Sequence, residues 1–179
     1  MSERFVPAIG RSIDTQQQYL EHLEQKRKLG STACDLCASV ERQDRNGIYP
    51  QIGEKALILT NELFTIIDND YPYVAYDGQR IETHHMLVPR EHIDFDSLKH
   101  DRKLRHLLAD AEDEALEASD HAYTTIVART STSRSSSIRA HAHEHLLVTG
   151  PSVTTQHFSI PEGQNDIWFS DGSGTQAST

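Results

Sequence analysis

The stretch that most constrains this chain is HAHEHLL, residues 141 to 147, in which three histidines alternate with other residues. Side chains alternate between the faces of a β-strand, so the pattern predicts a strand with His141, His143 and His145 on one face. At about 3.3 Å per residue the outer rings would lie roughly 13 Å apart, too far to share a metal ion whose nitrogen ligands lie about 2.1 Å away. Two neighbouring rings could share a metal, which leaves a histidine for nucleophilic or acid–base chemistry. A surface strand with accidental histidines is the alternative, and the apolar run that follows disfavours it.

Length and charge limit what the rest of the chain can do. With 179 residues, 36% of them hydrophobic, we expect one core and therefore one domain over residues 31–160, with a helical extension over 1–30 and a tail over 161–179 whose end is disordered. A net charge of −10 argues against non-specific nucleic-acid binding. The sequence has neither an apolar run long enough for a membrane span nor a signal-peptide layout, so we expect no membrane association and a cytoplasmic location.

The periodicity predicts an α+β fold with a mainly antiparallel five-stranded sheet and one long helix, plus an N-terminal helix. The helices are expected over Ser12–Leu29 and from Asp96 or Ser97 to about Asp120, and Glu41–Pro50 is expected to be irregular. The β-rich runs at Ala56–Leu59 and Phe64–Ile67 are expected to form a hairpin. The other strands are expected at His85–Pro89, Tyr123–Ala128 and from Ile138 or Arg139 to Val148, with a serine-rich loop at Thr130–Ser137.

The two cysteines of the chain, Cys34 and Cys37, form a Cys-x-x-Cys motif. Such a pair is either a metal clip or a redox motif. A redox site of the thioredoxin kind lies in a βαβ setting, whereas here a charged helix precedes the motif and polar sequence follows it, which favours metal.

These residues together resemble a known family. His-x-His-x-His before two apolar residues, preceded about fifty residues earlier by HMLVPREH from His85 to His92, is similar to the histidine triad superfamily of nucleotidyl hydrolases and transferases. The upstream segment is one residue tighter before the proline than the family pattern. Residues 69–73, NDYPY, resemble a loop of the diadenosine-polyphosphate phosphorylase and galactose-1-phosphate uridylyltransferase branches. The resemblance covers roughly Cys34 to Pro151.

The resemblance implies a role for each matched residue. His143 is the expected nucleophile towards an α-phosphorus, His145 is expected to donate a hydrogen bond to phosphate, and His85 is expected to support the triad from the neighbouring strand. The implied ligands of a structural zinc ion, four in number and closing a tetrahedral shell, are Cys34, Cys37, His92 and His141.

Other positions depart from the family pattern or lie outside it. The usual glycine- and glutamine-containing loop before the triad is replaced by a serine-rich stretch, which is either a phosphate-binding loop or a flexible connection. The candidate substrate-binding residues are Asn69, Arg134, Ser136, Ser137 and Arg139. Glu144 should face away from the histidines, which leaves the burial of that face open. His84 adjoins His85, cannot share its strand face, and is expected on the solvent side.

The resemblance thus implies a homodimeric, zinc-containing enzyme that acts on a small nucleotide. The expected reaction is hydrolysis at the α-phosphate of a dinucleoside polyphosphate or nucleoside phosphoramidate through a nucleotidyl-histidine intermediate. The alternatives are a nucleotidyl transferase or phosphorylase, and a zinc-stabilised nucleotide-binding module without turnover.

Overall fold

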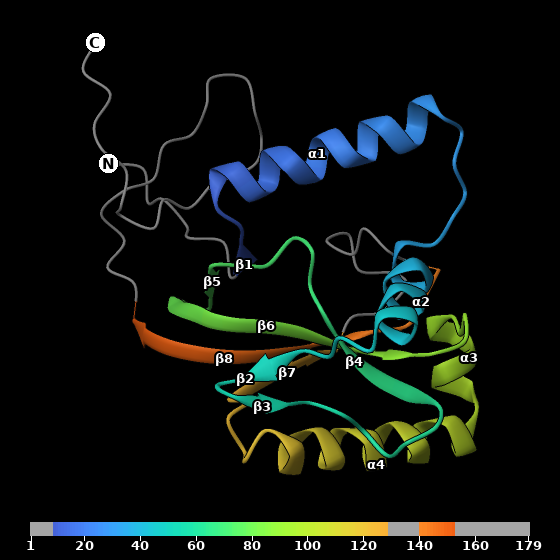
Figure 1. Ribbon diagram of the computed structural model, residues 1–179, viewed down its shortest axis with the longest axis vertical. Helices are drawn as coiled ribbons and strands as arrows, with labels where there is room; N and C mark the ends of the chain where they lie inside the picture. The colour runs from blue at the N-terminus through green and yellow to red at the C-terminus, as the bar shows by residue number, and fades with distance from the viewer. Residues whose placement is uncertain (1–8, 129–139, 153–179) are drawn as a thin grey trace. The chain divides into compact units, whose positions relative to one another are not determined.

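The computed structural model describes residues 9–128 and 140–152 of the chain. These residues combine helices with a mainly antiparallel sheet, which confirms the predicted α+β class (Figure 1). The chain folds into two compact units. Of the described residues, one unit contains Thr32–Asn69, 83–128 and 140–148, and the other contains 9–31, Asp70–Glu82 and 149–152. None of the helices in the described ranges is long and apolar enough to span a bilayer.

The first helix of the larger unit, α2 (Asp35–Asn46), begins directly after Cys34. Its apolar positions Leu36 and Val40 are four residues apart and are both buried, so one face of the helix packs into a core. The helix ends at Gly47, whose φ of 64° suits glycine. The expectation that residues 41–50 are irregular is therefore wrong for most of that range, because the charged residues that suggested a loop occupy the exposed face of this helix.

The predicted long helix is present but is divided in two. The first part is α3 (Phe95–His100), and the second is α4 (Arg102–Ala118). Asp101 has an extended backbone, and its carboxylate accepts a hydrogen bond from the Lys103 amide at 2.7 Å, so it caps α4 and interrupts the helix.

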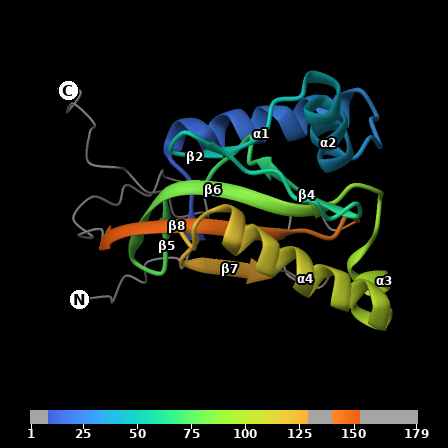
Figure 2. The ribbon, with the colours of Figure 1, turned by 60° about the horizontal axis from the view of Figure 1, so that its bottom comes forward.

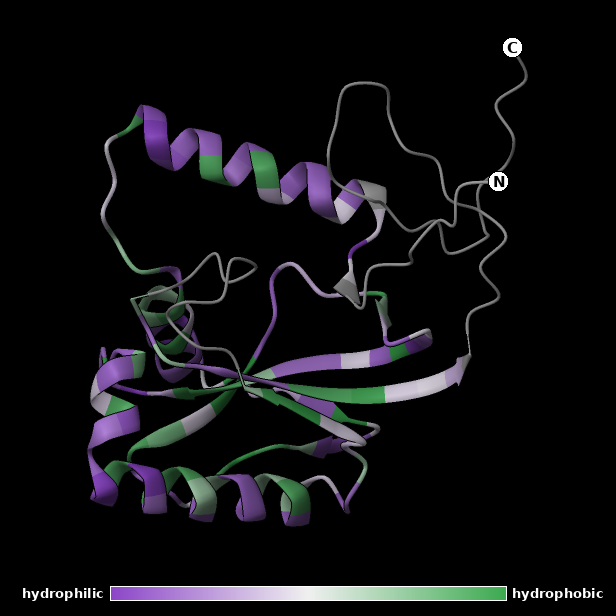
Figure 3. Cartoon of the chain, turned by 180° about the vertical axis from the view of Figure 1, so that it is seen from behind, coloured by the Kyte–Doolittle hydropathy of each residue, from purple (hydrophilic) through white to green (hydrophobic). Residues whose placement is uncertain are grey.

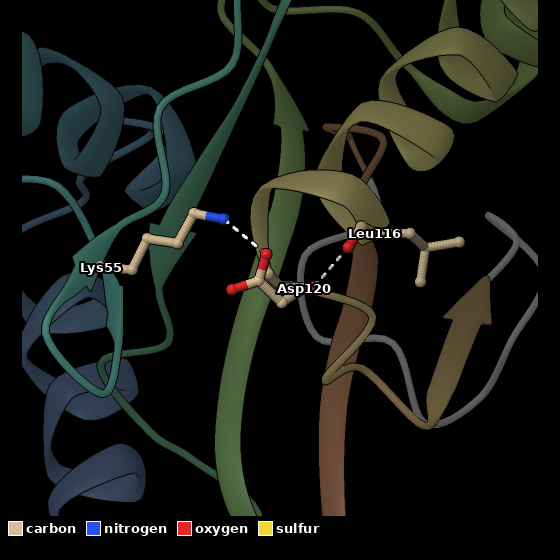
Figure 4. A network of polar contacts seen from close by, with 4 residues as sticks. Lys55, Leu116 and Asp120 are labelled. Atoms are coloured by element: carbon tan, nitrogen blue, oxygen red, sulfur yellow. Dashed lines mark hydrogen bonds and ion pairs between the residues drawn. The ribbon is translucent and has the colours of Figure 1, made fainter.

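The chain leaves α4 through Asp120 and His121, which have φ values of 53° and 58°. The amide of His121 donates to the carbonyl of Leu116 at 2.7 Å, which closes the end of the helix. Nearby, Lys55 forms a 2.8 Å ion pair with the exposed carboxylate of Asp120 (Figure 4).

The predicted hairpin is wrong. Strand β4 (Phe64–Asp68) pairs antiparallel with β6 (Gln79–Pro89), so that Phe64 lies opposite Pro89. The preceding apolar run contributes only to a small separate ladder between β2 (Gln51–Ile52) and β3 (Lys55–Ala56). Leu57 and Leu59 are instead buried in the core without belonging to a strand. Their apolar character therefore reflected core packing rather than strand pairing.

The other strands of this unit complete the sheet. β8 (Glu144–Ser152) lies between β6 and β7 (Thr125–Ala128), and β7 pairs antiparallel with β8. Helix α4 runs along one face of these strands (Figure 1, Figure 2). Hydrophobic and hydrophilic residues alternate around α4 (Figure 3), as expected for a helix that buries one side.

Two cores cover the opposite faces of this sheet. Consecutive residues Ile66 and Ile67 enter different cores, as strand alternation requires. The core on the α4 side includes Phe64, Ile66, Leu87, Phe95, Leu98, Ala111, Ala115, Tyr123 and Leu146. The core on the α2 side consists of Leu36, Val40, Ile67, Met86 and Val88 with Cys34 packed against it. On β6, even-numbered residues therefore face α2 and odd-numbered residues face α4.

The smaller unit contains the predicted N-terminal helix, α1 (Ile13–Lys28), together with β1 (Ile9–Gly10), β5 (Ala75–Tyr76) and the beginning of β6. The hydroxyl of Ser12 accepts a hydrogen bond from the Thr15 amide at 3.2 Å and caps α1. The guanidinium of Arg11 lies 4.5 Å from the ring centre of Tyr19 and donates to the carbonyl of Tyr71 at 2.9 Å. The predicted tail over 161–179 is outside the described residues.

Candidate functional site

The histidine triad begins before the strand that was expected to carry it. β8 starts at Glu144, so His141 and His143 precede it, and the prediction of a regular strand from residue 138 or 139 is wrong for them. The amide of Ala142 donates to the carbonyl of Ile93 at 2.7 Å, which joins this segment to the loop after β6. The three imidazoles are nevertheless buried, and the rings of His143 and His145 lie 5.2 Å apart between centroids.

Four residues far apart in the sequence converge on a potential metal-binding site. One ligand atom from each of them lies within 4.8 Å of every other, and the residues are Cys34, Cys37, His92 and His141. The Sγ of Cys34 lies 3.3 Å from Nδ1 of His141, and the Sγ of Cys37 lies 3.2 Å from Nδ1 of His92. These separations approach the roughly 3.6 Å expected between sulfur and nitrogen ligands of one tetrahedral ion. The cluster could therefore hold a metal ion.

The backbone orients this cluster. The imidazole Nε2–H of His141 donates to the carbonyl of Pro89 at 3.1 Å, so in the neutral ring Nδ1 carries the lone pair that faces the cysteines. Cys34 is the residue before the first turn of α2 and Cys37 lies within that turn. Amide groups at the beginning of a helix favour negative charge, so this placement suits thiolate ligands.

The two thiols differ in their pKa. For Cys34, burial opposes ionisation, but the hydrogen bonds with His141 and with the backbone and side chain of Cys37 outweigh it and lower the pKa to about 6. For Cys37, burial and the neighbouring Cys34 raise the pKa to about 11. In the metal-free protein one thiolate therefore forms more readily than the other, and a cation that binds both would displace the second proton.

His143 is held in one tautomer. Its Nδ1–H donates to the backbone carbonyl of His141 at 2.9 Å, which leaves the lone pair of the neutral imidazole on Nε2. The ring of Phe95 lies 5.4 Å from the His143 ring between centroids. The arrangement gives His143 an Nε2 that can act as a nucleophile or a base.

His145 belongs to a second hydrogen-bonded chain. Its Nδ1 lies 2.8 Å from Nε2 of His84, and the side-chain nitrogen Nδ2 of Asn69 lies 3.0 Å from the same atom of His84. The side chains of His84 and His145 are 6% and 4% exposed, so this contact is shielded from water. Asn69, a candidate substrate-binding residue, therefore lies next to the histidine cluster.

The expectation that His84 faces solvent is wrong, and so is the placement of His85 beside the triad. Because the faces of β6 alternate, His84 points to the side of Met86 and Val88, whereas His85 points to the side of Leu87. The sequence did hold the signal. Counted back from Pro89, His84 lies one residue further away than His85 and so matches the spacing of the family pattern.

His85 instead forms a chain within the α4-side core. The hydroxyl of Tyr123 donates to its Nδ1 at 2.7 Å, and its Nε2–H points to a carboxylate oxygen of Asp68 at 3.4 Å. Burial lowers the pKa of His85, although the charge of Asp68 opposes the shift. Burial and the charge of Asp68 both raise the pKa of Tyr123. His85 is therefore a neutral, hydrogen-bonded core residue near neutral pH.

Glu144 lies on the α4 side of β8, away from the histidines, as alternation predicts. It is 7% exposed, so this face of β8 is buried at Glu144. Burial, followed by its hydrogen bond with the Glu112 carboxyl and the charge of that group, raises the pKa of Glu144 to about 8. The protonated carboxyl of Glu144 thus lies on the face of β8 opposite to the histidines.

The remaining candidate substrate-binding residues, Arg134, Ser136, Ser137 and Arg139, lie outside the described residues. Comparison with known proteins does not identify the chain. No family model and no curated protein matches it. A solved crystal structure of HTC1 is similar with a TM-score of 0.41 and 18% identity, covering 79% of this chain and 76% of that one.

Proposed function

We propose that this chain is a nucleotidyl hydrolase that acts through a covalent intermediate on His143. The observation that carries the proposal is the hydrogen bond from Nδ1 of His143 to the His141 carbonyl, 2.9 Å long. It fixes the tautomer in which Nε2 carries the lone pair, which is the form of histidine that can attack phosphorus.

In the proposed reaction, Nε2 of His143 attacks the α-phosphorus of a nucleoside phosphate derivative. A phosphorus–nitrogen bond forms as the bond to the leaving group breaks, and the leaving group takes up a proton from protonated His145, whose ring lies 5.2 Å from that of His143 between centroids. Water then cleaves the phosphorus–nitrogen bond and releases the mononucleotide, which regenerates His143.

His84 takes the supporting role that the family resemblance implied for His85. Its 2.8 Å contact with Nδ1 of His145 fixes the ring of that histidine and directs Nε2 away from β6. Asn69 lies behind His84 in the same chain of contacts. Substitution of His84 should therefore impair proton transfer to the leaving group more than it impairs binding.

We also propose that the ion held by Cys34, Cys37, His92 and His141 is zinc. Two thiolates and two imidazoles are a usual ligand set for structural zinc, and these four residues would supply all the ligands of such an ion. A closed shell leaves no position for substrate, so when bound the ion supplies rigidity to the segment before β8 rather than chemistry at the phosphate.

The candidate substrates are dinucleoside polyphosphates and nucleoside phosphoramidates. Incubation of the purified protein with a panel of both, followed by chromatography of the products, tests the proposal. We expect release of a mononucleotide by the wild type and by His100→Ala, which alters an exposed histidine of α3, and no release by His143→Ala. Binding without turnover by the wild type would contradict the proposal and favour a nucleotide-binding module. A product carrying added phosphate would instead indicate a transferase.

A further inference from the structure

The segment after β6 runs beside the segment before β8, and successive contacts join them. The rings of His92 and His141 lie 4.8 Å apart between centroids. The amide of Ala142 donates to the carbonyl of Ile93 at 2.7 Å. Further along, the ring of Phe95 lies 5.4 Å from that of His143, tilted by 58°. Two of the potential metal ligands, His92 and His141, and the residue proposed as nucleophile are thus held by the same pair of segments.

Phe95 is itself firmly placed. It is the first residue of α3, directly after Asp94, whose carboxylate accepts a hydrogen bond from the Ser97 amide at 2.7 Å and caps the helix. Its side chain is 9% exposed and belongs to the α4-side core together with Leu98. Because both the backbone and the side chain of Phe95 are held in place, its ring stays in one position beside the imidazole of His143.

This surface limits the rotation of the His143 ring. A half-turn about the Cβ–Cγ bond would exchange Nδ1 with a ring carbon and would break the hydrogen bond to the His141 carbonyl. Phe95 and His145 both border the ring, at centroid distances of 5.4 and 5.2 Å. Only one orientation of the imidazole combines this packing with a satisfied Nδ1–H.

We infer that Phe95 is a positioning residue for the nucleophile, and this inference rests on the proposed role of His143. Phe95 keeps the imidazole in the orientation in which Nδ1 donates to the backbone and Nε2 carries the reactive lone pair. It acts on the chemical step through His143 without contributing a reacting group. Small displacements of a reacting group are known to cost about a hundredfold in rate, so the effect of removing the ring is measurable.

The test compares Phe95→Leu with Phe64→Leu. Phe64 is a matched control because it belongs to the same core and is 0% exposed, but it lies on β4 opposite Pro89. Both substitutions create a cavity and cost comparable stability. We expect only Phe95→Leu to slow the nucleotidylation of His143 in single-turnover experiments, by about tenfold to a hundredfold, with little change in KM.

A second readout does not depend on activity. In ¹⁵N NMR spectra of neutral His143, the wild type and Phe64→Leu should show a single tautomer with the proton on Nδ1, and Phe95→Leu should show a mixture. Phe95→Tyr keeps the ring and should restore both the rate and the single tautomer. If Phe95→Leu folds poorly, Phe95→Met fills the site with a flexible apolar side chain and should give the same loss of rate and of tautomer.

The outcomes separate the inference from the proposed function. Absence of nucleotidylation in the wild type would refute the role of His143. Nucleotidylation of the wild type together with equal rates and one tautomer in the Phe95→Leu or Phe95→Met protein would refute the positioning role alone. Equal loss of rate in Phe64→Leu would also refute it, because a general loss of core packing would then explain the effect.

Discussion

Glu144 should make the stability of this protein depend on pH in a direction unusual for a carboxylic acid. Glu144 is only 7% exposed, and the carboxyl of Glu112 lies beside it. Two carboxyl groups can share a hydrogen bond only if one of them keeps its proton. Burial, with the contribution of Glu112, accordingly raises the pKa of Glu144 from 4.5 to about 8.

The sign and size of the effect follow from this difference. In the unfolded chain the group loses its proton near pH 4.5, whereas in the folded protein it keeps the proton up to about pH 8. Between these values the folded state binds more protons, so the free energy of unfolding falls as pH rises, by about 1.4 kcal/mol per pH unit. The loss of unfolding free energy reaches about 3 kcal/mol at pH 7 and levels off above the folded pKa of about 8.

Glu144→Gln tests this reasoning because glutamine keeps the shape of the side chain and cannot ionise. Its amide N–H can still donate to the Glu112 carboxylate. The assay is urea unfolding at constant metal content from pH 4.5 to 8. We expect the free energy of unfolding of the variant minus that of the wild type to rise by about 3 kcal/mol between pH 4.5 and pH 7.

The matched control is Glu117→Gln, which alters an exposed carboxylate of α4. Its stability difference from the wild type should not change appreciably over the same pH range. A constant difference between Glu144→Gln and the wild type across that range would refute the reasoning, because it would mean that Glu144 ionises alike in the folded and unfolded states.

Further predictions concern the metal site and the polar contacts around the sheet. His141→Ala should lose bound metal and stability, whereas His143→Ala should keep both, as elemental analysis and thermal unfolding would show; the opposite pattern would contradict the division of roles. Tyr123→Phe should cost about 1–3 kcal/mol of unfolding free energy in denaturant titrations, since it leaves the buried Nδ1 of His85 without its donor, and a neutral effect would argue against that bond. Lys55→Ala should leave the stability in the same assay nearly unchanged because its ion pair is exposed (Figure 4), and a clear loss of stability would contradict this prediction.

The sequence predicted the elements whose signals are local. The helix at Ile13–Lys28 has a capping serine and a basic last turn, and the strand ending at Pro89 follows from the missing amide of proline. The four residues of the potential metal site also have recognisable spacings, and they do converge in the structure. These features needed no knowledge of which segments pack together.

Features that depend on pairing were not predictable in the same way. The apolar run around Leu57 gave the same signal as a strand, and only the pairing of β4 with β6 shows that it fills the core instead. The choice between His84 and His85 required knowing which face of β6 is turned to the cysteine side. Strand alternation separates His84 from His85, but the sequence alone does not show which of the two faces is turned to the cysteines.

The proposal of a histidine nucleophile is tested most directly by trapping the intermediate. Wild-type protein is mixed with a substrate whose second step is slow, quenched in base because phosphorus–nitrogen bonds are labile in acid, and examined by intact-mass spectrometry followed by peptide mapping. The account predicts one added nucleotidyl group per chain, carried by His143, and none on the His143→Ala variant. Turnover without any such adduct, or an adduct on His141 or His145, would contradict it.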